Sequence, residues 1–441
     1  MEQSYYNVMA PLEAGGALVY NVNRETMLEL DRDERVAFEE FTQGKRALED
    51  HLSQALAQEG MLVESAEAEA EALLYRHNLY RYNTRTFDLT IMPTRACNCA
   101  CDYCYVNKHS SFMTQETQDL VMRFVEECYE NAPFTKLRVS WYGGEPLLAI
   151  GVMEALSVRF LDFCEKRGIR YHGHMLTNGT LADKAMCERL VNNCGMVSVM
   201  PTISGDGRMH EWQRPLRDGS QYFDTFLANI DNMLEAGMLV RPNYVVNHNN
   251  FEQCNSLSKR LCHKPGMSTR LTRTFAYGRE GMVLKDGKDT PMELFGRAEF
   301  SPYYARFFRE QNLGSAGYEE LLRPQPLYCA AWVDRQYYID EIGDVFCCMI
   351  DMDYPDLALF NLHARAQGDD SFNIARKAEY MNMEPARDEQ CRKCCVLPIC
   401  QGGCAYWRIL GDDVCHDLKD CIEEVVVDYY NALQSEEKYG D

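Results

Sequence analysis

The sequence predicts an α/β fold in which a partial (β/α)6 barrel lies between a small amino-terminal unit and a cysteine-rich carboxyl-terminal region. A strand–helix rhythm begins near residue 87 and repeats six times. Successive βα units form a parallel sheet that curls into a full or partial barrel. No cysteine precedes Cys97, and the cysteine density rises again after about residue 328. The length of 441 residues exceeds what one core usually serves, so several domains are expected.

Composition restricts the partners and the compartment. The amino terminus has no basic segment followed by an apolar run, and no apolar stretch is long enough to span a bilayer. We therefore expect a cytoplasmic protein without a membrane partner, whose 20 cysteines stay reduced. The formal net charge of −22 argues against nucleic acid as a partner, since phosphate binding needs basic patches.

The amino-terminal unit is expected at residues 1–75. "GALVYNV" and "TMLELD" predict a pair of strands, and "RDERVAFEEFTQG" and "ALEDHLSQALAQEG" have helical patterns. The acidic, alanine-rich "VESAEAEAEALLYRHN" predicts a linker helix, and we place the linker itself at residues 76–90.

The barrel is assigned to residues 91–310. Its predicted strands are "FDLTIMPT", "KLRVSWYG", "RYHGHMLTNG", "VSVMPTISG", "LVRPNYVV" and "TRLTRTFAYG". Helical patterns such as "ETQDLVMRFVEECYENA" and "FDTFLANIDNMLEAG" fall between them. In such folds the chemistry sits at the carboxyl ends of the strands.

The stretch "RACNCACDYCY" follows the first of these strands and therefore lies at the chemically active end. Its Cys97, Cys101 and Cys104 have the spacing C-x3-C-x2-C. A zinc site usually takes four protein ligands from paired C-x2-C units. Three thiolates on one short loop suit instead a [4Fe–4S] cluster with one iron left open for an external ligand.

This motif, including the aromatic residue before its last cysteine, resembles the signature of radical S-adenosylmethionine (SAM) enzymes. The resemblance implies that the methionyl amine and carboxylate of SAM bind the open iron. One electron then cleaves the sulfonium, and the resulting 5′-deoxyadenosyl radical abstracts a hydrogen from the substrate. The protein positions both molecules and excludes competing reactions. By the same resemblance Cys99 is not a ligand, and an electron donor such as flavodoxin or ferredoxin is an expected partner.

Later strand ends resemble the family's SAM-binding segments in the expected order. "WYGGEPLL" resembles the GGEP motif, whose glycines let the backbone approach the amino group of SAM. "MLTNGT" and "ISGDG" resemble segments that line the ribose and the methionyl carboxylate, and "DGRMHEWQRPLRDG" places an arginine near the site. The predicted SAM-binding residues are Gly143, Gly144, Glu145, Thr177, Asn178, Ser204, Asp206 and Arg214.

The carboxyl-terminal region contains "CRKCCVLPICQGGC" and, upstream of it, Cys329 and "GDVFCC", a G-x4-C that ends at Cys348. This series resembles the SPASM extension of radical SAM enzymes, which we assign to residues 311–441. The resemblance covers roughly residues 85–425 and implies two auxiliary [4Fe–4S] clusters, hence three clusters in all.

The same resemblance implies the auxiliary ligands. The ligands of the outer cluster are expected to be Cys391, Cys394, Cys400 and Cys415. Cys415 is preferred over Cys421 because "CHDLK" resembles the family's last cysteine with a lysine a few residues on. The ligands of the inner cluster are expected to be Cys329, Cys348 and Cys404. Either Cys347 completes the inner set or one iron stays open to a substrate group, and we favour the open iron.

Other cysteines and another metal also have to be considered. A structural zinc ribbon is the alternative for the carboxyl-terminal region, because C-x2-C is a zinc spacing too. Cys395 is left without a role. The single cysteines expected to be buried hydrophobic residues are Cys128, Cys164, Cys187, Cys194, Cys254 and Cys262.

Two reactions compete within the resemblance. Sulfatase-maturating enzymes convert a cysteine or serine to formylglycine, whereas peptide maturases install thioether, carbon–carbon or related crosslinks in ribosomally made precursors. Sulfatase maturases place the first cysteine motif near the amino terminus, but here about ninety residues precede it. They also have an aspartate proton acceptor after the G-x4-C cysteine, where this chain has Met349, with Asp351 as the nearest acid.

We therefore predict a peptide maturase, with sulfatase maturation as the alternative. A non-catalytic iron–sulfur or zinc scaffold is the second alternative. The leading unit resembles the small, winged-helix-like PqqD-type domain, which binds a leader peptide by adding it as a strand to a sheet edge. The expected partner is a precursor peptide with a leader; a domain that only caps the barrel is the other interpretation of this unit.

Overall fold

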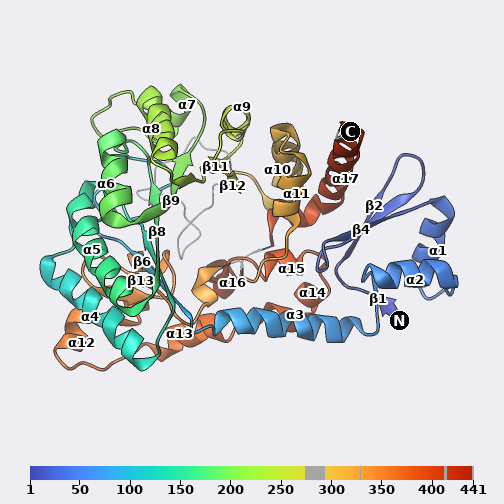
Figure 1. The fold of residues 1–441 in the computed structure, drawn as a ribbon, viewed down its shortest axis with the longest axis horizontal. Helices are drawn as coiled ribbons and strands as arrows, with labels where there is room; N and C mark the ends of the chain where they lie inside the picture. Colours follow the sequence, from blue (N-terminus) through green and yellow to red (C-terminus); the bar gives the residue numbers. More distant parts are fainter. Residues whose placement is uncertain (274–293, 328, 412–414, 440–441) are drawn as a thin grey trace. The chain divides into compact units, whose positions relative to one another are not determined.

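The computed structural model describes residues 1–273, 294–327, 329–411 and 415–439 (Figure 1). The chain folds into two compact units, each built from separated segments. The terminal unit takes residues 1–81, 296–329 and 382–441, and the barrel unit takes residues 82–295 and 330–381. Within the described ranges, no helix has the length and apolar character needed to cross a membrane.

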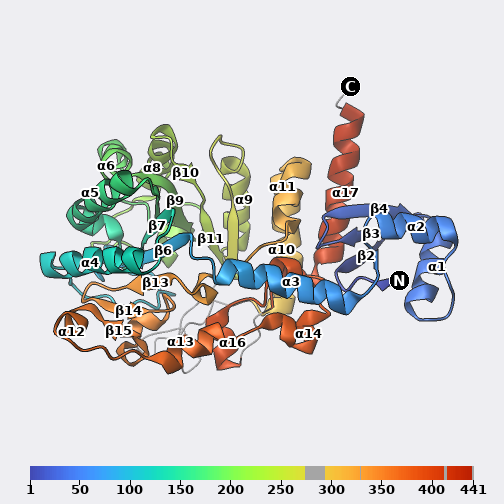
Figure 2. The same cartoon turned by 60° about the horizontal axis from the view of Figure 1, so that its bottom comes forward.

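The barrel unit is built on a parallel sheet whose strands follow one another in chain order (Figure 2). This confirms the predicted series of βα units; the end of the sixth predicted strand, beyond residue 273, lies outside the described residues. The strands are β6 (Thr86–Ile91), β7 (Lys136–Trp141), β8 (Arg170–Thr177), β9 (Met196–Ile203), β11 (Asn243–Val246) and β12 (Arg270–Arg273), with the short β10 (Leu239–Val240) beside β9.

Helices between the strands cover the outer face of this sheet. They are η1 (Pro146–Ala149), α4 (Gln115–Asn131), α5 (Ile150–Arg167), α6 (Lys184–Cys194), α7 (Arg208–Gln213), α8 (Phe223–Glu235) and α9 (Phe251–Leu261). Local signals set their ends: Thr114 caps α4 through the backbone N–H of Thr117, and α5 stops at Gly168, whose φ of +66° suits glycine.

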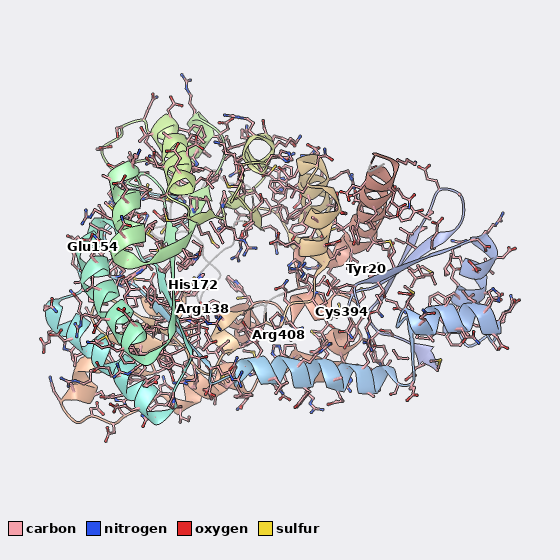
Figure 3. All side chains as sticks on the ribbon, in the orientation of Figure 1. Tyr20, Arg138, Glu154, His172, Cys394 and Arg408 are labelled. Carbon is pink, nitrogen blue, oxygen red and sulfur yellow. The ribbon has the colours of Figure 1, made fainter. Side chains whose placement is uncertain are left out.

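Period-two burial separates the two faces of the sheet. In β7 the side chains of Leu137, Val139 and Trp141 are buried, whereas the residues between them are half-buried. Arg138 on β7 lies opposite His172 on β8 (Figure 3). The alternation gives one apolar face for the helices and one polar face, as strand geometry requires.

A further parallel strand comes from the region expected to be SPASM. β13 (Gln336–Ile339) pairs in parallel with β6, and β14 (Asp344–Phe346) and β15 (Phe360–Asn361) continue the sheet antiparallel. Residues 330–381 therefore fold with the barrel, and no unit boundary falls at residue 311. The accompanying helices are η3 (Ala330–Trp332), η4 (Asp351–Asp353), η5 (Pro355–Leu357), α12 (Leu362–Ala366) and α13 (Ile374–Met381).

The terminal unit contains an antiparallel sheet of β2 (Asn7–Pro11), β3 (Ala17–Asn21) and β4 (Thr26–Leu30). The predicted strand pair is β3–β4. One face packs on α1 (Arg32–Thr42) and α2 (Asp50–Gln58) through a core that includes Val19, Leu30 and Phe38. Helix α17 (Ile422–Tyr439) packs on the sheet as well, where Tyr429 meets Tyr20 edge to face and the Tyr430 hydroxyl donates to Glu29.

The predicted linker helix exists as α3 (Ala66–Arg81), but it packs within the terminal unit. Its Glu67 and Glu71 accept hydrogen bonds from Arg392. The remaining elements of this unit are β1 (Glu2–Gln3), β5 (Leu62–Val63), α10 (Arg297–Gln311), α11 (Gly314–Leu322), η6 (Pro385–Arg387), α14 (Glu389–Arg392), α15 (Leu397–Cys400), α16 (Ala405–Leu410) and η7 (Asp417–Asp420).

Candidate iron–sulfur sites

The first cysteine loop, residues 96–106, follows β6 and is held by the backbone of residues 213–217. Ala100 N–H donates to the Pro215 carbonyl and Arg217 N–H to the Asn98 carbonyl, at 2.8 Å each. Cys97, Cys101 and Cys104 are half-buried. The loop therefore carries the three predicted ligands on a braced backbone.

Cys99 differs from the other three cysteines of the loop because it is fully buried. Its backbone N–H donates to Cys97 Sγ at 3.4 Å. Side-chain hydrogen bonds with Cys101 and Cys97 raise the pKa of the Cys99 thiol far above its ordinary value. A protonated, buried thiol in this place fits the prediction that Cys99 is not a ligand.

Cations surround the loop. Lys108 Nζ donates to the Cys99 carbonyl and Arg217 Nε to the Cys97 carbonyl, both at 2.9 Å. Burial alone lowers the pKa of Lys108, but the neighbouring thiolates, Cys101 first, outweigh it and leave the pKa raised. A positive surrounding suits an anionic cluster held by three thiolates.

Gly143 and Gly144 bring the turn after β7 onto this loop. Gly144 N–H donates to the Thr94 carbonyl at 3.1 Å. A Cβ at Gly144 would lie 2.1 Å from the Ala96 carbonyl oxygen, and Gly143 has a φ of +138°. Only glycine fits both conditions, so the turn and the cysteine loop pack backbone to backbone. The predicted approach of these glycines to SAM stays a prediction.

Glu145 ties the ends of β7 and β8 together. Its buried carboxylate accepts from Thr177 Oγ1 at 2.8 Å, Asn178 N at 2.7 Å and Leu147 N at 3.1 Å. Burial raises the pKa of Glu145 to about 7, against these hydrogen bonds. Asn178 Nδ2 in turn donates to Asn98 Oδ1 of the cysteine loop at 2.7 Å. The structure thus brings three predicted SAM-binding residues together beside Cys97.

The other predicted contacts fall into two places. Ser204 and Arg214 are buried and meet at the Tyr103 hydroxyl, which lies 2.7 Å from Ser204 Oγ and 2.5 Å from Arg214 Nη1. Asp206 is half-buried and pairs with Arg260 at 3.0 Å. Tyr103, the aromatic residue of the cysteine motif, is therefore the centre of this second group.

Arg95 anchors the start of the cysteine loop to the segment before and after Cys348. Its guanidinium donates to Glu341 at 3.0 Å, to Asp353 at 2.5 Å and to Asp340 at 3.2 Å. Asp353 also accepts the backbone N–H of Asn107 at 2.8 Å, at the other end of the loop. The sequence carries no signal for this anchor, because its partners lie 245 to 258 residues from Arg95.

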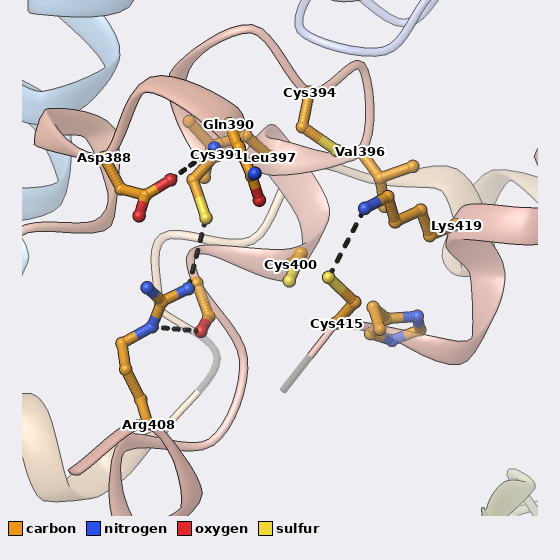
Figure 4. Close-up of a pocket in the computed structure, with 12 residues that line it drawn as sticks. Asp388, Gln390, Cys391, Cys394, Val396, Leu397, Cys400, Arg408, Cys415 and Lys419 are labelled. Carbon is orange, nitrogen blue, oxygen red and sulfur yellow. Dashed lines mark hydrogen bonds between the residues drawn. The ribbon is translucent and has the colours of Figure 1, made fainter. Parts of the chain in front are cut away.

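The second site is a cavity of about 220 Å³ in the terminal unit (Figure 4). It is lined by Cys391, Cys394, Cys400 and Cys415, the four cysteines assigned to the outer cluster. The structure thus brings these four cysteines to one cavity; whether they hold an iron–sulfur cluster or zinc stays a prediction.

Two neighbouring cysteines, Cys421 and Cys395, do not line this cavity. Cys421, the alternative ligand, is buried and donates to the Asp417 and Leu418 carbonyls. Cys395 forms a side-chain hydrogen bond with Cys394, which raises the pKa of the Cys395 thiol and lowers that of Cys394 to about 6.

Two cations donate directly to sulfur at this cavity. Arg408 Nη2 lies 3.1 Å from Cys391 Sγ, and Lys419 Nζ lies 3.5 Å from Cys415 Sγ (Figure 4). Sequence reasoning noted the lysine as part of the motif and missed Arg408, which no spacing rule connects to Cys391.

The residues assigned to the inner cluster are divided between the units. Cys329 and Cys404 belong to the terminal unit, whereas Cys348 and the neighbouring Cys347 belong to the barrel unit and are buried. Their assignment to one cluster, with or without an open iron, stays a prediction.

The single cysteines largely follow expectation. Cys128 is only half-buried, which corrects its assignment as a core residue. The others are buried: Cys164, Cys187, Cys194, Cys254 and Cys262.

Comparisons with known proteins agree with this reading of the barrel unit. Residues 91–255 match the model of the radical SAM superfamily. A serine-type anaerobic sulfatase-maturating enzyme of Klebsiella pneumoniae is 22% identical over 340 residues, 72% of this chain and 81% of the relative. One of Klebsiella aerogenes is 24% identical over 208 residues, and this match spans about half of that relative, 49%.

Solved structures show the same fold. The chain matches anSMEcpe with bound AdoMet and Cp18Cys peptide at a TM-score of 0.57 and 17% identity, over 78% of this chain and 99% of that one. It matches SuiB of Streptococcus suis at a TM-score of 0.52 and 16% identity, over 94% of this chain and 100% of that one. A further SuiB structure has the precursor peptide SuiA bound.

Radical SAM enzymes use SAM and a [4Fe–4S] cluster, and the cysteine loop of this chain has three thiols and neighbouring cations that suit such a cluster. Through residues 91–255, the chain is similar to the radical SAM superfamily.

Proposed function

We propose that the chain is a radical SAM peptide maturase, which abstracts a hydrogen from a ribosomally made precursor peptide and installs a thioether or carbon–carbon crosslink. The observation that carries this proposal lies directly after Cys348. Met349 occupies the position at which the sulfatase-maturase pattern has a proton-accepting aspartate. A thioether side chain accepts no proton at neutral pH.

The nearest acid does not replace the missing aspartate. Asp351 is fully buried, and its carboxylate accepts from Arg376 Nη2 at 2.6 Å, from Arg376 Nε at 3.1 Å and from the Tyr380 hydroxyl at 3.1 Å. A carboxylate held by a bidentate arginine is stabilised in its charged form and has its lone pairs engaged. Asp351 is therefore a structural anion of the barrel unit.

The cofactors of this function are SAM and three [4Fe–4S] clusters. When bound, the first cluster and SAM supply the radical that abstracts hydrogen. The chain holds the first cluster by Cys97, Cys101 and Cys104 and keeps the loop in place through Arg95 and the glycine turn. The cavity residues hold the outer cluster, and Cys329, Cys348 and Cys404 hold the inner one. An electron donor such as flavodoxin or ferredoxin reduces the protein.

The sheet of the terminal unit is the proposed place of leader recognition. Its faces pack on α1 and α2 and on α17, so its edges, β2 and β4, are where a further strand can pair. Strand addition gives affinity through backbone hydrogen bonds, whatever the side chains. The fold match to SuiB covers 94% of this chain, whereas the match to anSMEcpe covers 78%. The similarity to SuiB therefore includes a part of the chain that the match to anSMEcpe leaves out.

Sulfatase maturation is the competing function, because both matched curated relatives carry that name. The two functions leave different products. Formylglycine carries an aldehyde, which a hydrazide tag captures, whereas closing one crosslink removes two hydrogen atoms and leaves no aldehyde.

The test uses the full chain, reconstituted with iron and sulfide under anaerobic conditions and reduced. It is incubated with SAM and the Cp18Cys peptide, and with a peptide library that begins with candidate leaders. We expect SAM cleavage, no hydrazide-reactive product, and a mass loss of two hydrogens in a library member. Aldehyde formation on Cp18Cys would establish the competing function. If SAM is not cleaved, the result would favour the second alternative, a non-catalytic iron–sulfur or zinc scaffold.

A further inference from the structure

The cavity in the terminal unit has an asymmetric set of hydrogen-bond donors. Arg408 donates to Cys391 Sγ and also, through Nε, to the Gly402 carbonyl at 3.2 Å, so its guanidinium is fixed by two partners. Lys419 donates to Cys415 Sγ. Asp388 also lines the cavity, but its carboxylate accepts the Cys391 backbone N–H at 2.9 Å as the cap of α14.

Donors of this kind act on the electron affinity of a cluster. Reduction adds one negative charge, which is spread over the cluster and its thiolate ligands. A cation hydrogen-bonded to a thiolate stabilises the added charge, and hydrogen bonds to the sulfurs are among the features that set cluster potentials. The effect is larger where water does not screen it.

From this arrangement we propose that Arg408, with a smaller contribution from Lys419, raises the reduction potential of the outer cluster and makes it the preferred resting place of an electron. Arg408 is half-buried and lies at 3.1 Å, whereas Lys419 is exposed and lies at 3.5 Å. The two residues act through their hydrogen bonds to the cysteine sulfurs and are not themselves ligands of the cluster. The proposal rests on the proposed function only in requiring a cluster in this cavity.

The test is a potentiometric titration of the reconstituted full chain, followed by electron paramagnetic resonance. A Cys97→Ala, Cys101→Ala, Cys104→Ala background removes the first cluster, and the signal that vanishes on adding Cys391→Ala is assigned to the outer cluster. In this background we expect Arg408→Met to lower the midpoint potential of that signal most, and Lys419→Met to lower it less. The difference in midpoint potential between Lys419→Met and the background should become smaller at 1 M salt. Lys419 is exposed, and salt at this concentration screens charges over about 3 Å.

The matched control is Lys393→Met. Lys393 lies between Cys391 and Cys394 in the sequence, is exposed, and pairs with Glu389 at 2.9 Å rather than with a sulfur. Lys393→Met removes one positive charge near the cavity without removing a donor to sulfur. The midpoint potential of the outer cluster should therefore stay close to that of the background. A midpoint in Arg408→Met equal to that in Lys393→Met would overturn the proposal.

Assembly of the cluster is measured in every variant by iron content. If Arg408→Met does not retain iron, Arg408→Gln, which keeps a donor and removes the charge, and Lys419→Met decide: lowered midpoints support the proposal and unchanged midpoints overturn it. If the unaltered cavity binds no iron, the proposed function fails. If it binds iron and the midpoints do not move, only the present inference fails.

Discussion

The first cysteine loop and the cysteine cavity of the terminal unit use the same residue types in different ways. At the loop, Lys108 and Arg217 donate to backbone carbonyls, whereas Cys97 Sγ accepts from two uncharged groups, the Cys99 backbone N–H and the Asn178 side-chain amide. At the cavity, Arg408 and Lys419 donate to cysteine sulfur itself. The cations of the loop therefore hold its backbone in place, whereas those of the cavity lie against the thiols themselves.

The difference suits two electronic tasks. A cluster that must give an electron to SAM needs a low potential, and one that receives an electron needs a higher one. Hydrogen-bond donors to thiolate raise the reduction potential of a cluster, so our proposal assigns the easier reduction to the cavity.

The largest expected effect separates the two sites by function. Cys97→Ala, Cys101→Ala, Cys104→Ala should abolish SAM cleavage, because no open iron remains to bind SAM. Cys391→Ala, Cys394→Ala should keep cleavage and lose crosslinking. Quantifying 5′-deoxyadenosine by chromatography checks both. SAM cleavage by the variant that lacks Cys97, Cys101 and Cys104 would show that the first cysteine loop is not the site of this reaction.

The second prediction concerns the anchor of the loop. Arg95→Gln leaves the buried Glu341 and Asp340 carboxylates without their cation, which should cost about 3 to 5 kcal/mol of the barrel unit's unfolding free energy. Urea unfolding followed by tryptophan fluorescence measures it, since Trp141, Trp212 and Trp332 lie in this unit.

The control for this anchor is an exposed ion pair of the same unit. Arg159 pairs with Asp119 at 2.8 Å, and its side chain is 35% exposed. Arg159→Gln should cost no more than about 1 kcal/mol. Equal costs for the two variants would show that the anchor does not stabilise the loop.

A smaller effect comes from the pH dependence of the same anchor. Burial, followed by repulsion from Glu341, raises the pKa of Asp340 to about 7, above its unfolded value of about 3.9. The folded state therefore binds more protons in this window, so stability should fall as pH rises from about 4 to about 7.

Asp340→Asn cannot titrate at this position. It should make the stability profile shallower over this window, by at most about 1.4 kcal/mol per pH unit. Urea midpoints at half-unit steps from pH 4 to 7 measure the slope. Parallel profiles for Asp340→Asn and the unaltered chain would show that Asp340 does not carry this dependence.

The smallest effects are expected at the extra cysteines of the two sites. Cys99→Ser and Cys395→Ser keep a hydroxyl donor beside the ligand thiols, so iron content and SAM cleavage should stay near those of the unaltered chain. Iron analysis decides this, and a loss of about four irons in either variant would identify a ligand.

The sequence predicted the barrel well because its signals are local. Apolar runs that end in glycine or asparagine turns marked β7 and β8, and the cysteine spacing identified the loop. The glycines of the GGEP motif were predicted from a resemblance, and the structure adds that Gly144 lets the turn approach Ala96. These features depend on a few neighbouring residues.

What the sequence could not show depends on distant contacts. β13 is four residues long, and only its pairing with β6 makes it part of the barrel sheet. The choice of Cys415 over Cys421 rests, in the structure, on which thiol faces the cavity. Arg408 carries no local signal for its contact with Cys391, because an arginine in a short helix is most often a surface charge.

The most direct test of the central claim is the iron and sulfide content of the anaerobically reconstituted chain, beside the variant that lacks Cys97, Cys101 and Cys104. We predict near twelve irons per chain, falling by about four in the variant, as three four-iron clusters require. Zinc without iron, or iron that the variant retains in full, would contradict the account.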